Sequence, residues 1–152
     1  MQNLSELVRR LISTNVEFVL VGGFAAVAHG VTLVTRDVDI CCRFTEANLM
    51  RIQEAFVDLH PVHRSRPDLP LALTPEQCAD LKNLYLKTDL GIVDCLAEVL
   101  AVGNFDEVAK HCLEMLDEDK PEVANFRGPL TNIVTHGRQA LDVIARIRSS
   151  QS

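Results

Sequence analysis

Apolar residues recur along the chain with two different periods, which predict alternating helices and strands. A helical period of three to four residues is found in residues 4–13, 24–29, 45–59, 105–111 and 130–147. Strand-like runs, either alternating or continuously apolar, occupy residues 16–21, 35–42, 84–87, 92–96, 112–116 and 122–126. We therefore predict an α/β fold of a single domain over residues 1–152, with a mixed β-sheet flanked by helices.

Prolines and turn residues divide the middle of the chain. Residues 60–75 are predicted to be a loop because they contain Pro61, Pro67, Pro70 and Pro75. The sequence from Thr74 to Gln77 is typical of a capped helix start, with a capping box between these two side chains. The runs over 84–87 and 92–96, joined through residues 88–91, predict a β-hairpin.

Composition and charge exclude several classes of protein. The formal net charge is −6 at pH 7, which argues against a broad basic surface for duplex DNA or a membrane but leaves room for a local basic groove. The chain lacks an apolar run of roughly eighteen residues that could span a membrane, and its N-terminus lacks a signal-peptide pattern. The five cysteines have no CxxC spacing. We expect a cytoplasmic protein with free thiols and no membrane partner.

Acidic residues on two of the predicted strands provide the candidate chemistry. Asp37 and Asp39 are two residues apart, so their side chains project from one face of a strand, and Asp94 follows the same alternation on a later strand. If the three carboxylates share a face, their repulsion requires cations or raised pKa values. Two Mg²⁺ ions would supply that charge, as in metal-dependent phosphoryl transfer. The alternative is that the pair on the first strand is only the solvent face of an edge strand.

A pair of glycines lies between the first predicted strand and the following helix. Gly22 and Gly23 allow close approach of a ligand, and the unpaired N–H groups of a helix start attract phosphate. A triphosphate site is therefore one interpretation of this turn, and an ordinary tight turn is the other. Dinucleotide binding, with Asp39 on a ribose, is a third interpretation, but a third glycine is missing and Asp37 and Asp94 are left unexplained.

The combined motif resembles a known family. Gly22-Gly23, Asp37-Val38-Asp39-Ile40 after thirteen further residues, and Val93-Asp94-Cys95 are similar to the signature of the nucleotidyltransferase superfamily related to DNA polymerase beta. The surrounding residues, over about positions 15–110, are similar to a bacterial subgroup related to the type IV abortive-infection toxins. The resemblance implies a polymerase beta palm-like fold. It also implies Mg²⁺- or Mn²⁺-dependent transfer of a nucleotidyl group from a nucleoside triphosphate.

The resemblance also assigns roles to individual residues. Asp37 and Asp39 would coordinate both metal ions, and Asp94 would be the third ligand and a general base for the acceptor hydroxyl. The nucleotide-binding residues implied or considered are Gly22, Gly23, Thr35 and Arg36. Arg36 alternates to the face opposite Asp37, so a structural salt bridge is as good an interpretation for it as phosphate binding.

The C-terminal part departs from the toxin-like pattern. The subgroup carries a lysine and an Arg-Lys-Asp-like run on its last helix, whereas this chain has no lysine after Lys120 and retains only Arg138 and Asp142. The alternative function is therefore a catalytically impaired protein that acts as a regulatory module or in a toxin–antitoxin pair, with a cognate protein partner. The acceptor also stays open between an RNA end, a protein hydroxyl and a small molecule.

One basic cluster lies outside the motif. It consists of His60, His63, Arg64 and Arg66. We expect a solvated basic loop, with metal binding and contacts to an acidic partner or RNA phosphates as alternatives.

Overall fold

The computed structural model describes residues 2–21, 36–99, 102–110, 130–135 and 139–144. The helical elements are α1 (Leu4–Ser13), α3 (Glu46–Ala55), the 3-10 turn η1 (Val57–Leu59) and α4 (Pro75–Cys78). The strands are β1 (Phe18–Val21), β2 (Asp37–Cys42), β3 (Val62–His63), β4 (Arg66–Pro70), β5 (Asn83–Thr88), β6 (Gly91–Leu96), β7 (Glu98–Val99), β8 (Gly103–Asn104), β9 (Leu130–Thr135) and β10 (Gln139–Ile144). Residues 105–110 form a further helix.

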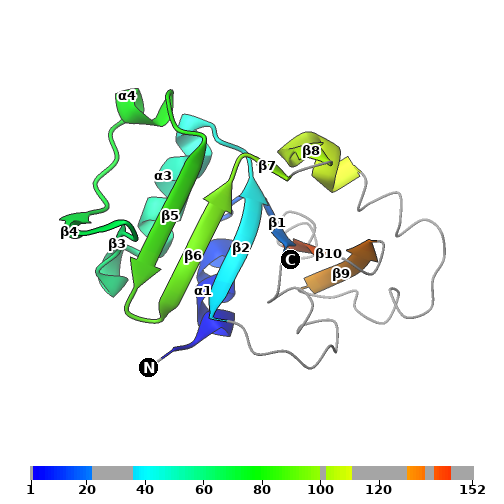
Figure 1. Cartoon of the computed structure of the whole chain (residues 1–152), viewed down its shortest axis with the longest axis horizontal. Coiled ribbons are helices and arrows are strands. Elements are labelled where there is room, and N and C mark those ends of the chain that lie inside the picture. The colour runs from blue at the N-terminus through cyan, green and yellow to red at the C-terminus, as the bar shows by residue number, and fades with distance from the viewer. Residues whose placement is uncertain (1, 22–35, 100–101, 111–129, 136–138, 145–152) are drawn as a thin grey trace.

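A mixed sheet organises these elements. Within the described residues, eight strands are hydrogen-bonded in the order β4-β3-β5-β6-β2-β1-β10-β9. The pair β2–β6 is parallel, and its neighbours β1 and β5 run antiparallel to it (Figure 1). The predicted class, a mixed sheet flanked by helices, is confirmed.

The main core lies between the sheet and two helices. In Figure 1, α1 and α3 lie behind the strands β5, β6 and β2. The core residues that the two helices contribute are Leu4, Leu7, Val8, Leu11, Leu49, Ile52 and Ala55. They pack against the inward side chains of the sheet, among them Val38, Ile40, Val93 and Cys95, each 0% exposed. This packing holds β2 and β6 at fixed positions.

The first helix begins and ends where the sequence predicts. The Asn3 side chain accepts a hydrogen bond from the N–H of Glu6 at 3.1 Å and caps the N-terminus. At the other end, Asn15 has φ of 61°, a left-handed conformation that asparagine tolerates better than most residues. The predicted helix over residues 4–13 is confirmed.

A buried asparagine joins the second helix to the ends of two strands. Asn48 in α3 is 1% exposed, and its side-chain oxygen accepts from the N–H of Glu17 at 2.8 Å. Its amide group donates to the carbonyls of Glu17 at 3.1 Å and Arg43 at 2.8 Å. These backbone groups lie just before β1 and just after β2, so one side chain connects both strands to α3.

Several local predictions are confirmed. Thr74 and Gln77 form the predicted capping box at the start of α4. The strands β5 and β6 form the predicted hairpin, with Thr88 opposite Gly91. The predicted helix over 24–29 and the predicted strands over 112–116 and 122–126 lie outside the described residues.

The loop predicted over residues 60–75 is wrong in its middle part. Residues 62–63 and 66–70 form the hairpin β3–β4, and β3 pairs with β5. Pro67 and Pro70 are compatible with this arrangement because β4 is the last strand at its end of the sheet. A proline that cannot donate to a ladder is tolerated on such an edge strand.

The helix predicted over residues 130–147 is also wrong. The structure has two antiparallel strands there, and β10 pairs with β1. All four residues of β1 are buried, so the strand is suited to a place inside the sheet rather than at an edge. The segment β9 is rich in β-branched residues, which favour strands: Thr131, Ile133, Val134 and Thr135. Short apolar runs fit both periods, which explains the error.

None of the helices within the described ranges is both long enough and apolar enough to cross a membrane.

Candidate metal centre

The parallel pair β2–β6 brings the acidic residues together. In its register Asp39 lies opposite Asp94, and Asp37 lies opposite Ile92. The residues that alternate with the acids, such as Val38 and Val93, point into the core and fix the orientation of both strands. The acidic side chains therefore project from the face of the sheet opposite α1 and α3.

The three carboxylates form a compact cluster. One oxygen atom from each of Asp37, Asp39 and Asp94 lies within 4.8 Å of the others. Asp94 is 7% exposed, and the other two side chains are half-buried. The sequence prediction that three distant acids share one face of the sheet is confirmed, while their roles in metal binding and catalysis stay predictions.

Burial and mutual repulsion make this cluster costly in its charged form. Desolvation is the main cause that raises the pKa of Asp39 to about 6, and the charges of Asp37 and Asp94 raise it further. Burial also raises the pKa of Asp94, against the opposing effect of Arg64. Val21, opposite Asp39 in the β1–β2 register, belongs to an apolar cluster on this face and contributes to the dehydrated surroundings.

An arginine from the β3–β4 turn contacts the cluster. The Nη2 atom of Arg64 donates to Oδ2 of Asp94 at 3.1 Å. Its guanidinium lies over the ring of Tyr85, 5.2 Å from the centroid, and Tyr85 is the register partner of Asp94. Arg64 is thus held against the one acid that is almost completely buried.

The second carboxylate oxygen of Asp94 has no hydrogen-bond donor among the described residues. Within the described part of the chain, Oδ1 of Asp94 is buried and accepts no hydrogen bond. A buried carboxylate oxygen without a donor is costly, because it loses water and gains nothing in return. A cation bound between the three carboxylates would satisfy this atom. Hard oxygen donors of this kind suit Mg²⁺ or Mn²⁺, so the residues fit the predicted metal.

Of the four predicted nucleotide-binding residues, Arg36 alone lies within the described residues. Gly22, Gly23 and Thr35 lie outside the described residues. Arg36 is exposed, and its backbone carbonyl accepts from Nε2 of Gln2 at 2.8 Å. Its side chain forms no ion pair with a described residue, so the structural salt bridge considered for it is not found there.

Arg64 is the site residue whose position sequence reasoning missed. The sequence predicts a solvated basic loop for the segment that contains it. The turn between β3 and β4 places Arg64 over Tyr85 and against Asp94, whereas the ion-pair partner of Arg66 among the described residues is exposed Asp68, at 3.6 Å. The available signal was an arginine in a tight turn between two short strand-like pieces, and the prolines concealed those strands.

Comparison with protein-family models, with curated proteins and with solved structures finds no match to this chain. A relation to the nucleotidyltransferase superfamily is therefore a proposal that rests on the resemblance of the motifs.

Proposed function

We propose that the protein is a Mg²⁺- or Mn²⁺-dependent nucleotidyltransferase of the polymerase beta-like superfamily. The observation that carries the proposal is the convergence of Asp37, Asp39 and Asp94 within 4.8 Å, with a buried oxygen of Asp94 that has no described donor. Three carboxylates on two adjacent parallel strands are the arrangement that the motif resemblance implies. A solvent-exposed edge strand does not explain them, because β2 lies between β1 and β6.

The proposed reaction transfers a nucleoside monophosphate group. The acceptor hydroxyl oxygen forms a bond to the α-phosphorus, the bond from that phosphorus to the bridging oxygen of the β-phosphate breaks, and pyrophosphate leaves. Divalent cations bound by the three carboxylates would neutralise charge on the phosphates and lower the pKa of the hydroxyl. The hydroxyl proton would pass to Asp94, the general base that the motif resemblance implies.

The nucleotide is proposed to bind on the β1 side of the acids. Val21 is the last residue of β1 and lies opposite Asp39, and Gly22 and Gly23 follow it in the chain. The backbone N–H groups of a glycine turn would hold the phosphates near the metal ligands. Arg64 contacts Asp94 from the opposite side of the acids, where β5 and β3 follow β6 in the sheet.

A direct test is metal-dependent nucleotide binding with labelled nucleoside triphosphates. We expect binding that requires Mg²⁺ or Mn²⁺ and is lost in Asp37→Asn and Asp39→Asn variants. Asp80→Asn removes the same charge at an exposed residue after α4 and serves as the matched control. Absence of metal-dependent binding at millimolar Mg²⁺ and Mn²⁺ would reject the proposal.

A second candidate is the catalytically impaired interaction module, and one observation favours it. The stretch proposed to carry the cationic run forms strands rather than a last helix, with Asp142 in β10 opposite Leu20. Arg138 lies outside the described residues. Under this hypothesis the protein binds nucleotide without transferring it and copurifies with a protein partner, as in a toxin–antitoxin pair. Release of pyrophosphate, in amounts that match labelled product, would exclude it.

We propose the cytoplasm as the compartment. The described cysteines are free thiols buried in the fold: Cys41, Cys42, Cys78 and Cys95. Free thiols are typical of reducing compartments.

A further inference from the structure

The β3–β4 turn places a cation at the position where the proposed metal centre also needs one. Atom Nη2 of Arg64 donates to Oδ2 of Asp94 at 3.1 Å. Desolvation raises the pKa values of Asp94 and Asp39, and the positive charge of Arg64 acts in the opposite direction on both acids. The guanidinium is therefore a counter-ion of the acidic cluster in the metal-free protein.

The contact between Arg64 and Asp94 is only partial. A guanidinium can give a carboxylate two parallel hydrogen bonds, one to each oxygen. Here Oδ2 receives one, and Oδ1 is buried without a donor among the described residues. Arg64 also brings a single positive charge to a cluster of three carboxylates whose oxygen atoms lie within 4.8 Å of one another. A divalent cation would compensate this cluster more completely.

The side chain of Arg64 is free to leave while its backbone stays in place. The N–H of Arg64 donates to the carbonyl of Tyr85 at 2.9 Å, next to the pairing of β3 with β5. The guanidinium lies over the Tyr85 ring, 5.2 Å from its centroid, and the side chain is 42% exposed. Because it is long and open to water, this side chain can move away from Asp94 without any rearrangement of the sheet.

A metal ion and Arg64 would compete for Asp94. Oδ2 already accepts from the guanidinium, so a metal ion that takes this oxygen removes the hydrogen bond. A metal ion that takes Oδ1 shares the carboxylate with the guanidinium, and two cations held so close together repel. In both cases metal binding becomes less favourable while Arg64 stays on Asp94.

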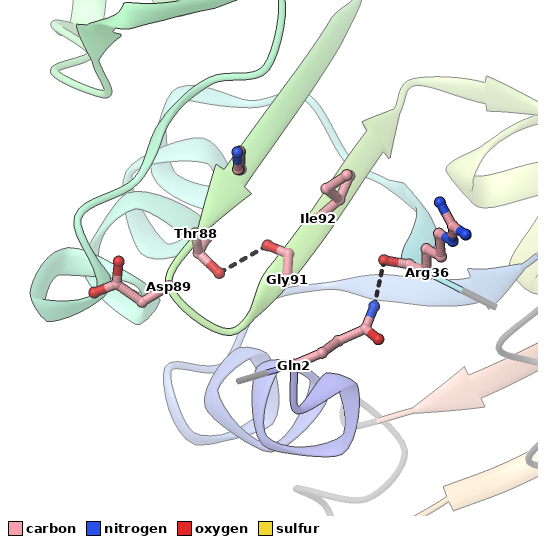
Figure 2. Close-up of a pocket in the computed structure, with 7 residues that line it drawn as sticks. Gln2, Arg36, Thr88, Asp89, Gly91 and Ile92 are labelled. Carbon is pink, nitrogen blue, oxygen red and sulfur yellow. Dashed lines mark hydrogen bonds between the residues drawn. The ribbon is translucent and has the colours of Figure 1, made fainter.

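Arg36, which precedes Asp37 in the sequence, is arranged differently. Figure 2 shows the hydrogen bond from Gln2 to its backbone carbonyl, at 2.8 Å. Its exposed side chain lines a recess of about 360 Å³ together with Lys87 and Ile92, and none of the three acids belongs to that lining. Closeness in sequence to an acid therefore does not produce the pairing, which depends on the β3–β4 turn.

We propose that Arg64 is a built-in counter-cation that occupies the acidic cluster and has to leave Asp94 before a divalent metal ion binds. Arg64 stabilises the metal-free protein and at the same time lowers its affinity for metal. When Arg64 leaves Asp94, its guanidinium moves from the Tyr85 ring into solvent. The inference rests on the proposed function and deepens it, because it assigns a means of regulation to the same metal centre.

The first test measures the affinity for Mn²⁺ by electron paramagnetic resonance, without nucleotide. We expect Arg64→Gln to bind Mn²⁺ about five- to tenfold more tightly than wild type, because a competing charge is removed. Arg64→Lys keeps that charge and should bind almost as weakly as wild type. Arg66→Gln removes the same charge elsewhere in the hairpin, from a residue paired with exposed Asp68, and should match wild type.

The sign of the change separates this role from a structural one. If Arg64 only supported the orientation of Asp94, its loss would weaken metal binding as well as stability. Equal or weaker Mn²⁺ binding by Arg64→Gln, relative to wild type, would overturn the proposal. Arg64→Lys binding as tightly as Arg64→Gln would also overturn it, because the effect would then not depend on charge.

The second test follows the displacement of the guanidinium by fluorescence. Tyr85 is the single tyrosine of a chain without tryptophan, so the intrinsic emission reports its surroundings alone. We expect Mg²⁺ to change this emission in wild type and to leave it unchanged in Arg64→Gln. A wild-type emission that stays constant at Mg²⁺ concentrations that displace Mn²⁺ would contradict the displacement, and so would an equal change in both proteins.

This proposal and the proposed function fail in different ways. If wild type and Arg64→Gln bind Mn²⁺ equally, the metal centre stands and the role of Arg64 falls. If neither binds Mn²⁺ at millimolar concentration, the metal centre falls, and the role of Arg64 falls with it. If Arg64→Gln gains affinity for Mn²⁺ but nucleoside triphosphates bind to neither protein, the role of Arg64 stands and the transferase proposal falls.

Discussion

The two faces of the β2–β6 pair differ sharply in chemistry although the same strands form both. On one face Val38, Ile40, Val93 and Cys95 are fully buried against α1 and α3. On the other face Asp37, Asp39 and Asp94 crowd together, and the pKa of Asp39 is raised to about 6. Strand alternation alone creates this division, since neighbouring residues point to opposite sides.

The difference separates stability from function. Burial on the apolar face stabilises the fold, whereas clustered carboxylates oppose it through repulsion and desolvation. Strain of this kind is common at functional sites, because a ligand of opposite charge relieves it. Arg64 offsets only part of the charge, through one oxygen of Asp94.

The largest effect is expected on the apolar face. Ile40→Ala should lower the free energy of unfolding by about 2–5 kcal/mol, because it leaves a cavity at a side chain that is 0% exposed. Urea denaturation followed by circular dichroism measures this change. A loss below about 1 kcal/mol would contradict the assignment of this face as the principal source of stability.

The second-largest loss of stability is expected when the buried side chain of Asn48, in α3, is removed. Asn48 satisfies backbone groups of Glu17 and Arg43 at both strand ends. Asn48→Ala should destabilise the fold by about 2–3 kcal/mol, because these groups lose their partners inside the protein. Asn83→Ala, at an exposed position in β5, is the control and should change little. Equal stabilities of the two variants would argue against the connecting role of Asn48.

Loss of the ion pair between Arg64 and Asp94 should lower the stability by a smaller amount. In EDTA, Arg64→Gln should destabilise the protein by roughly 1–2 kcal/mol, because buried Asp94 loses its partner while solvent screens the half-exposed arginine. Added Mn²⁺ should restore most of this loss. Arg66→Gln, in the same hairpin but paired with exposed Asp68, should match wild type. Equal thermal stabilities of the two variants would contradict the role given to Arg64.

The smallest effect has the opposite sign and depends on pH. The folded state raises the pKa of Asp39 from 3.8 to about 6 under the influence of burial, Asp37 and Asp94, with Arg64 opposing. The folded state therefore holds an extra proton between these values, and stability falls as the pH rises through them. Asp39→Asn should be more stable than metal-free wild type by roughly 1 kcal/mol at pH 8, after allowance for solvent screening.

Thermal unfolding in EDTA at several pH values measures this difference. The advantage of Asp39→Asn should shrink as the pH falls from about 6 towards 3.8, and below that pH the aspartate is protonated in both states. A pH-independent difference, or a less stable variant, would show that the carboxylate is not strained.

Sequence reasoning was most successful where one pattern had one structural solution. The alternation through Asp37, Val38, Asp39 and Ile40 allowed only one distribution between two faces, and the buried strand β6 supplied the third acid in register. The stripe of α1 and the capping box of α4 were equally unambiguous.

Long-range pairing accounts for most of what could not be predicted. The strand β4 forms despite its prolines because it lies at an edge, and β10 forms because β1 takes a partner distant in sequence. Neither condition can be read from local periodicity. The contact between Arg64 and Asp94 depends on the first of these pairings, because Arg64 lies in the turn between β3 and β4.

The most direct measurement of the central claim is Mn²⁺ binding, followed by electron paramagnetic resonance without nucleotide. We expect wild-type protein and Asp80→Asn to bind Mn²⁺, and Asp39→Asn and Asp94→Asn to lose that binding. If all four proteins bind Mn²⁺ equally, or if none does at millimolar concentration, the three carboxylates are not a metal centre.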